Sequence, residues 1–98
     1  MPNREIDKRP KLLSVYCRAR NTRLEIDVFE ISTHSCLLDL RAWRLKQNER
    51  IMINLPGLTW IGATILWADN GLGGVIFEQP LHVAVLNHLL KTNDRRER

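Results

Sequence analysis

The chain has 98 residues, of which 44% are hydrophobic and 27% are charged, the length and composition of a single folded domain. Its formal net charge of +4 comes from its ends, because residues 1–11 and 91–98 hold eight basic and four acidic residues, whereas residues 12–90 hold seven of each. A domain without a basic face is a poor match for a long polyanion, so the composition argues against nucleic acid as a partner.

The N-terminal residues 1–11 are charged and contain no apolar run, so they do not resemble a signal peptide. No apolar stretch reaches the roughly 18–20 residues of a membrane span. The two cysteines, Cys17 and Cys36, do not form a disulfide framework. These features predict a cytoplasmic protein with reduced thiols.

Alternating apolar and polar residues predict strands through the middle of the chain. The predicted strands are 13–20, 23–31, 36–40, 50–55, 60–67 and 73–77. Turn residues separate several of them, at Asn21-Thr22, Pro56-Gly57 and Asp69-Asn70-Gly71. The alternation slips at Phe29, where we expect a bulge. The connection 42–49 is polar, but Trp43 and Leu45 are expected to pack inward.

After Pro80 the apolar spacing becomes helical and predicts one helix from Leu81 to Lys91. The fold class is therefore predicted to be all-β, a small six-stranded antiparallel β-barrel with one C-terminal α-helix. We expect residues 1–11 to form a flexible basic arm, residues 12–91 the barrel with its helix, and residues 92–98 a disordered charged tail.

Several short motifs in this order resemble the PilZ family of bacterial signalling domains. The run from Glu30 to Ser35 resembles the family's Asp/Asn-x-Ser-x-x-Gly signature, and Arg4 with Lys8 resembles its Arg-x-x-x-Arg signature. The stretches 53–57, 63–67 and 74–81 are similar to later strands of the family and to the start of its helix. The resemblance covers roughly residues 4–90 and implies a PilZ-type barrel.

The resemblance also implies a ligand, because PilZ domains bind the second messenger cyclic di-GMP and relay its level to a partner protein. The implied ligand-binding residues are Arg4, Lys8, Arg9, Glu30, Ser32 and Ser35. Arginine suits this role because its planar fork of donors matches phosphate and the guanine edge. Three positions depart from the family pattern: Lys8 replaces Arg, Glu30 replaces Asp or Asn, and Ser35 replaces Gly.

Other interpretations of the same residues stay open. The arm is equally well explained as a solubilising tail, and Ser32 as a hydroxyl that caps a turn. Trp43, Trp60 and Trp67 are more often core residues than base-stacking platforms. The main alternative function is a PilZ-like adaptor that has lost nucleotide binding and acts through protein–protein interaction. A third is an OB-like single-strand binder.

We predict no enzymatic activity, no cofactor and no metal. His34 and Cys36 suggest a base and a nucleophile, but no third group to orient them is evident from the sequence. His82 and His88 are spaced for different sides of a helix, and the cysteines lack zinc-site spacing. The expected partners are therefore cyclic di-GMP and an unidentified protein.

Overall fold

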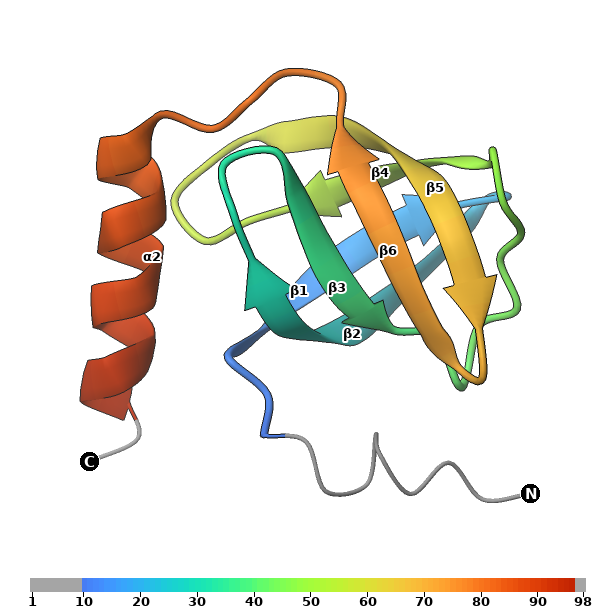
Figure 1. Cartoon of the computed structure of the whole chain (residues 1–98), viewed down its shortest axis with the longest axis horizontal. Helices are drawn as coiled ribbons and strands as arrows, with labels where there is room; N and C mark the ends of the chain where they lie inside the picture. Colours follow the sequence, from blue (N-terminus) through green and yellow to red (C-terminus); the bar gives the residue numbers. More distant parts are fainter. Residues whose placement is uncertain (1–9, 97–98) are drawn as a thin grey trace.

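The computed structural model describes residues 10–96, which form six strands and one helix. The elements are β1 (Leu13–Ala19), β2 (Thr22–Ile31), β3 (Ser35–Asp39), β4 (Arg50–Asn54), β5 (Trp60–Asp69), β6 (Leu72–Phe77) and α2 (Val83–Arg96). The strands pair antiparallel and close into a barrel in the order β1-β2-β3-β6-β5-β4 (Figure 1). The predicted six-stranded antiparallel barrel with a C-terminal helix is confirmed.

Two tight hairpins join neighbouring strands. In the β5–β6 turn, Asn70 and Gly71 have φ values of 51° and 80°, as a two-residue turn with left-handed central residues requires. The turn predicted at Asp69-Asn70-Gly71 is therefore confirmed. In the β1–β2 turn, Arg20 and Asn21 have the positive φ values, 54° and 61°, so the turn lies one residue earlier than predicted. Asparagine tolerates a left-handed conformation better than most residues, so Asn21 is the residue in the sequence that indicates this turn.

The core fills the barrel because one residue of each alternating pair points inward. The largest fully buried side chains are Leu38, Ile51, Ile53, Leu55, Ile65, Val15, Val28, Val75 and Cys17. Trp43 and Leu45 leave the β3–β4 connection to join the same core, as predicted. Strands from every side of the barrel therefore share one hydrophobic core.

Two β-bulges distort the strands on either side of the β3–β6 pair. In β2 the register shifts between Val28 and Glu30, which confirms the bulge expected near Phe29. In β5 it shifts between Ile65 and Trp67, a bulge that the sequence did not predict. A bulge adds one residue to a strand and changes which face the following side chains occupy.

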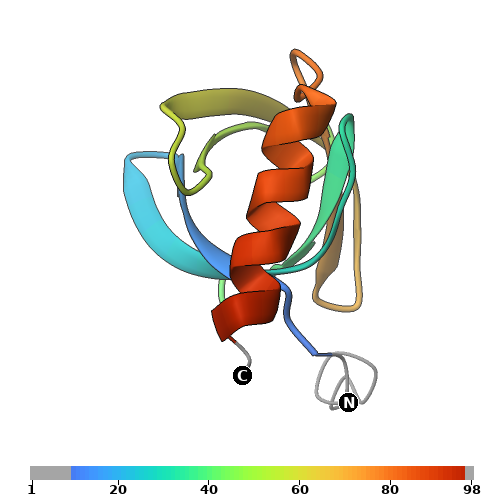
Figure 2. The same ribbon diagram turned by 90° about the vertical axis from the view of Figure 1, so that its left-hand side faces the viewer.

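Helix α2 lies across one open end of the barrel (Figure 2). Leu89 is buried there, and Leu81 and Val85 pack against the core beside it. The helix begins at Val83 rather than at the predicted Leu81, because the imidazole Nδ1 of His82 accepts a hydrogen bond from the Ala84 amide at 3.0 Å and caps the first turn.

The helical backbone also continues through Arg96, beyond the predicted end at Lys91, into residues that the sequence assigned to a charged tail. The apolar stripe that predicted the helix stops near Leu90, whereas Lys91, Arg95 and Arg96 in the extension are good helix formers. Within the described residues, no helix has both the length and the apolar character needed to cross a membrane.

Candidate ligand-binding site

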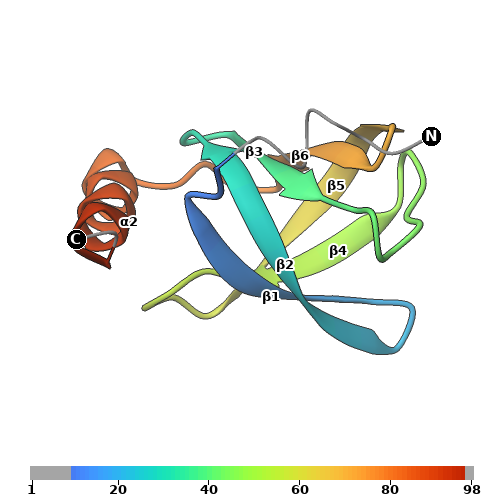
Figure 3. The ribbon, with the colours of Figure 1, turned by 90° about the horizontal axis from the view of Figure 1, so that it is seen from below.

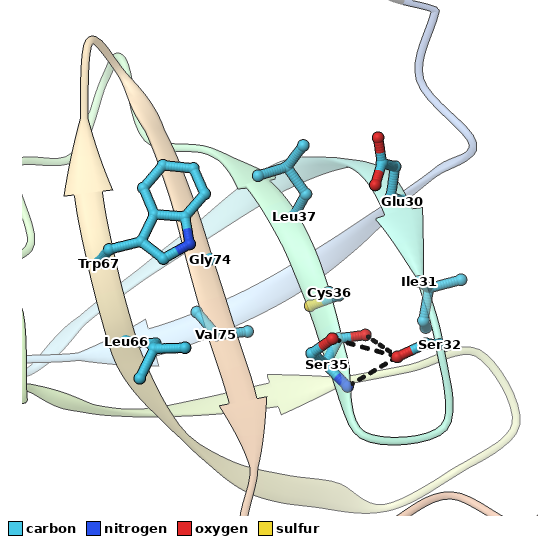
Figure 4. A pocket seen from close by; sticks show the side chains of 10 residues that line it. All are labelled: Glu30, Ile31, Ser32, Ser35, Cys36, Leu37, Leu66, Trp67, Gly74 and Val75. Carbon is cyan, nitrogen blue, oxygen red and sulfur yellow. Dashed lines mark hydrogen bonds between the residues drawn. The ribbon is translucent and has the colours of Figure 1, made fainter.

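A pocket of about 270 Å³ opens on the outer wall of the barrel, where the end of β2 meets β3, β6 and β5 (Figure 4). Its lining residues are Glu30, Ile31, Ser32, Ser35, Cys36, Leu37, Leu66, Trp67, Gly74 and Val75. The pocket brings together three of the residues that the sequence analysis proposed for ligand binding: Glu30, Ser32 and Ser35.

The other three proposed ligand-binding residues, Arg4, Lys8 and Arg9, lie outside the described residues. The described chain begins at Pro10 and leads into β1, which pairs with β2. Leu12 donates a backbone hydrogen bond to the carbonyl of Val28 at 2.7 Å. The described chain therefore enters the barrel beside the bulged part of β2.

Ser32 holds the tight turn between β2 and β3. Its hydroxyl oxygen accepts hydrogen bonds from the backbone amides of His34 at 3.3 Å and Ser35 at 3.1 Å, and its own amide donates to the Ser35 carbonyl at 2.8 Å. The Ser32 and Ser35 hydroxyls lie 3.1 Å apart (Figure 4). Ser32 thus has the turn-capping role that was one of its two predicted interpretations.

Ser35 occupies the position where the PilZ signature has glycine. It begins β3, and it is not one of the non-glycine residues with positive φ. A side chain at this position therefore causes no left-handed backbone strain. The departure from the family pattern changes the chemistry of the pocket, by adding a hydroxyl, rather than the path of the chain.

The side chain of Trp67 lines the pocket, whereas a core position was predicted for it. The side chain is 41% exposed, in contrast to the buried Trp43. The cause is the bulge in β5, where Leu66 is the extra residue and Trp67 pairs with Gly74. Simple alternation from the buried Ile65 places Trp67 inward, and the bulge returns it to the outer face.

Gly74 makes room for the indole of Trp67. A Cβ atom at Gly74 would lie 2.7 Å from Cε2 of the indole and closer still to Nε1. The ring therefore lies across the glycine on β6, as Figure 4 shows. The useful signal in the sequence was the Gly73-Gly74 pair within an otherwise apolar strand, because glycine there marks a close approach.

The lining divides into a polar and an apolar part. Glu30, Ser32 and Ser35 place a carboxylate and two hydroxyls on the β2–β3 side, whereas Trp67, Leu66 and Leu37 provide an aromatic and aliphatic surface. Such a site suits a flat ring that stacks on the indole and presents N–H groups at its edge.

Cys36 lines the pocket as a protonated thiol. It is buried, and burial raises its pKa far above the ordinary value, so the nucleophilic thiolate is scarce at neutral pH. The neighbouring His34 is exposed, and its Nδ1 lies 3.0 Å from the Thr33 hydroxyl. Within the described chain, no three His, Cys, Asp or Glu side chains are grouped to hold a metal ion.

No protein-family model matches this chain, and no curated protein matches it. The similarity of its short motifs to the PilZ family therefore stays a prediction. The fold and the pocket are the structural observations on which a functional proposal can be built.

Proposed function

We propose that this protein is a PilZ-type signalling domain that binds cyclic di-GMP in the pocket on β2, β3, β5 and β6. The observation that carries the proposal is the convergence of Glu30, Ser32 and Ser35 with the exposed indole of Trp67 in one pocket. Short sequence motifs predict the first three as ligand-binding residues. Trp67 adds the aromatic face that a nucleotide base requires.

The pocket has the size for part of the ligand. Its volume of about 270 Å³ is just under the ~300–1,000 Å³ of typical small-molecule sites. We therefore assign to it one guanine with its flanking phosphate. The base stacks on Trp67, a contact worth about 1–3 kcal/mol, and the N–H groups of its edge donate to the Glu30 carboxylate.

The N-terminal arm supplies the positive charge in this proposal. Arg4 is the principal phosphate or guanine contact, and Lys8 or Arg9 assists it, as the resemblance implies. Arginine and lysine differ here, because only arginine offers a planar fork and a stacking surface. Ordering the arm over the outer end of β2 changes the surface offered to a partner protein, and this change is the proposed signal.

The alternative function is an adaptor of the same fold that no longer binds nucleotide. Two observations favour it. Lys8 stands where the family has its second arginine, and the Ser32 hydroxyl is already engaged by two backbone amides. In this alternative the pocket is a remnant and only protein contacts matter.

Calorimetric titration of the full chain with cyclic di-GMP separates the two functions. The proposal expects saturable binding, and Trp67→Leu weakens it by about tenfold because stacking is lost. Trp60→Leu, which removes a tryptophan on a different part of the barrel, is the matched control and leaves affinity within about twofold. Arg4→Ala weakens binding while the circular dichroism spectrum stays unchanged.

Absence of binding heat at high ligand concentration would contradict the receptor function and favour the adaptor. Equal losses in Trp67→Leu and Trp60→Leu would contradict the assigned pocket, because they would show that the effect is general to the fold. Binding that is insensitive to Arg4→Ala would remove the arm from the mechanism but keep the pocket.

A further inference from the structure

An arginine–aromatic cluster, composed of Tyr16, Arg18, Arg23 and Trp60, lies on the outer face of the barrel. The guanidinium carbon of Arg18 is 4.9 Å from the centroid of the Trp60 ring. The guanidinium carbon of Arg23 is 4.6 Å from the centroid of the Tyr16 ring and 5.6 Å from that of Trp60. These are cation–π distances, and the two cations share one indole.

Strand register explains how these four side chains meet. Arg18 on β1 is directly opposite Arg23 on β2, and Trp60 on β5 reaches the cluster across β4. The intervening residue Cys17 is buried in the core, so Tyr16 and Arg18 project outward. The cluster thus lies on the wall formed by β1 and β4, across the barrel from β3 and β6 (Figure 3).

The two arginines of the cluster differ from three of the other four arginines in residues 12–90. Each of those three is held by a carboxylate: Arg20 by Glu49, Arg41 by Asp39 and Arg50 by Glu78. Arg18 and Arg23 make no ion pair and no hydrogen bond with any residue that the structure describes. Among the described residues, the contacts of their guanidinium groups are with the faces of aromatic rings.

The strand register brings two like charges together. Like charges directly opposite each other on neighbouring strands destabilise a sheet. The ring contacts offset this repulsion by about 0.5–1 kcal/mol each at exposed sites. They leave the guanidinium N–H groups without an oxygen acceptor among residues 10–96, and those groups are suited to grip carboxylates in pairs of parallel hydrogen bonds.

We propose that the arginine–aromatic cluster is a docking surface for an acidic segment of a partner protein. Each guanidinium binds one Asp or Glu carboxylate of that segment, and Tyr16 with Trp60 provides the apolar contact around them. Arg, Tyr and Trp are the residue types that contribute most to the energy of protein interfaces. The proposal stands independently of cyclic di-GMP, because it uses the opposite wall of the barrel.

The charges around the cluster favour a protein segment over nucleic acid. Glu25 lies opposite Tyr16, and Asp27 follows on the same face of β2. Residues 12–90 carry no net charge. Two cations with carboxylates of the same protein beside them suit a partner segment that carries a few carboxylates at matching positions. A nucleic acid instead needs a continuous basic track along its phosphates.

The test measures binding of a fluorescein-labelled peptide of alternating glutamate and glycine by anisotropy, at low ionic strength and with the full chain. We expect R18Q/R23Q to weaken the affinity by about tenfold or more, as the loss of a charge-assisted contact does. The matched control R20Q/R50Q removes the same charge from arginines that already have carboxylate partners, and it changes the affinity by less than about threefold. Because both variants keep the basic ends of the chain, binding to those ends cancels in the comparison.

Two further arms keep the proposal falsifiable. In the wild-type chain labelled with ¹⁵N, the peptide should shift the Nε–H signals of Arg18 and Arg23 and the indole signal of Trp60. R18K/R23K, which keeps the charge but loses the fork, should still weaken binding severalfold.

Three outcomes would overturn the proposal. The first is equal affinity of R18Q/R23Q and R20Q/R50Q for the peptide. The second is unshifted arginine and indole signals. The third is a labelled oligothymidylate that binds more tightly than the peptide and depends on the same two arginines, since the surface would then serve nucleic acid.

Discussion

Opposite walls of this barrel use their outward residues in different ways. The wall of β3 and β6 is hollowed, because two bulges and Gly74 let an indole lie flat beside a turn capped by Ser32. The wall of β1 and β4 has unbroken register, and its outer face holds arginines stacked on aromatic rings.

The two walls differ in how much their outward residues contribute to the fold. On the pocket wall, Gly74 and Ser32 shape the pocket, so we expect changes there to affect both folding and the proposed binding. On the β1–β4 wall, Arg18 and Arg23 are exposed, so we expect changes there to affect the proposed docking more than the fold. Each of the following predictions tests part of this contrast.

The largest effect is expected in the core that both walls share. Leu38 on β3 and Ile53 on β4 are fully buried. Leu38→Ala and Ile53→Ala should each lower the free energy of unfolding by about 2–5 kcal/mol, with a single transition in urea followed by circular dichroism and by fluorescence. Leu66→Ala is the control, because Leu66 is 55% exposed. Separate transitions for the two walls would contradict a shared core.

The second-largest effect is expected at the contact between the Trp67 indole and Gly74. Gly74→Ala places a Cβ against the indole of Trp67, and overpacking of this kind costs about 1–3 kcal/mol. In a Trp67→Ala background the clash is absent, and Gly74→Ala should stabilise the strand by about 0.5 kcal/mol. The measurement is a double-mutant cycle by urea unfolding. The same cost in both backgrounds would show that the indole does not lie across Gly74.

A pH experiment tests the buried thiol on the β1 side. Burial raises the pKa of Cys17 from 9.0 to about 12. As the pH rises above 9, the unfolded chain releases this proton and the folded chain does not, so stability is present below pH 9 and is lost toward pH 12. Between pH 7.5 and pH 10 the stability advantage of the wild type over Cys17→Ala should therefore shrink by about 1–2 kcal/mol. A constant difference would mean that the thiol ionises in the folded protein.

A smaller effect belongs to the β2–β3 turn. Ser32→Ala removes the acceptor of two backbone amides, and the loss of such a cap costs about 1 kcal/mol. Ser35→Ala removes only a hydroxyl that contacts Ser32 and should cost about half as much or less. The measurement is the urea midpoint of each variant. Equal costs would show that the turn does not depend on the Ser32 cap.

The sequence predicted the fold well because period-two alternation and turn residues are local signals. The strand that carries Leu13, Val15 and Cys17 follows directly from this pattern. The helix ends were missed because an imidazole cap and a charged last turn leave little trace in an apolar pattern.

The pocket was only partly predictable. Glu30, Ser32 and Ser35 lie within six residues, so one short motif identified them. Trp67 was missed because its side is set by a bulge, which depends on the pairing of β5 with β6. The arginine–aromatic cluster was missed for the same reason. Arg18, Arg23 and Trp60 are brought together by three strand pairings, and the sequence shows only isolated residues.

The smallest effect is expected for Arg18 and Arg23, the exposed arginines of the β1–β4 wall. R18Q/R23Q removes two exposed cations, their ring contacts and their mutual repulsion at once. The three lost cation–π contacts cost about 0.5 kcal/mol each at such exposed sites, and the relief of opposing like charges returns up to about 1 kcal/mol. The free energy of unfolding should therefore fall by about 1 kcal/mol or less, measured by urea unfolding at low salt.

The control for this prediction is the same measurement at high salt, which screens exposed charges. There the repulsion no longer opposes the ring contacts, and R18Q/R23Q should be more destabilising relative to wild type than at low salt. A loss as large as that of Leu38→Ala would contradict the contrast between the walls. It would show that Arg18 and Arg23 are structural, and that the β1–β4 wall depends on its outward residues as strongly as the pocket does.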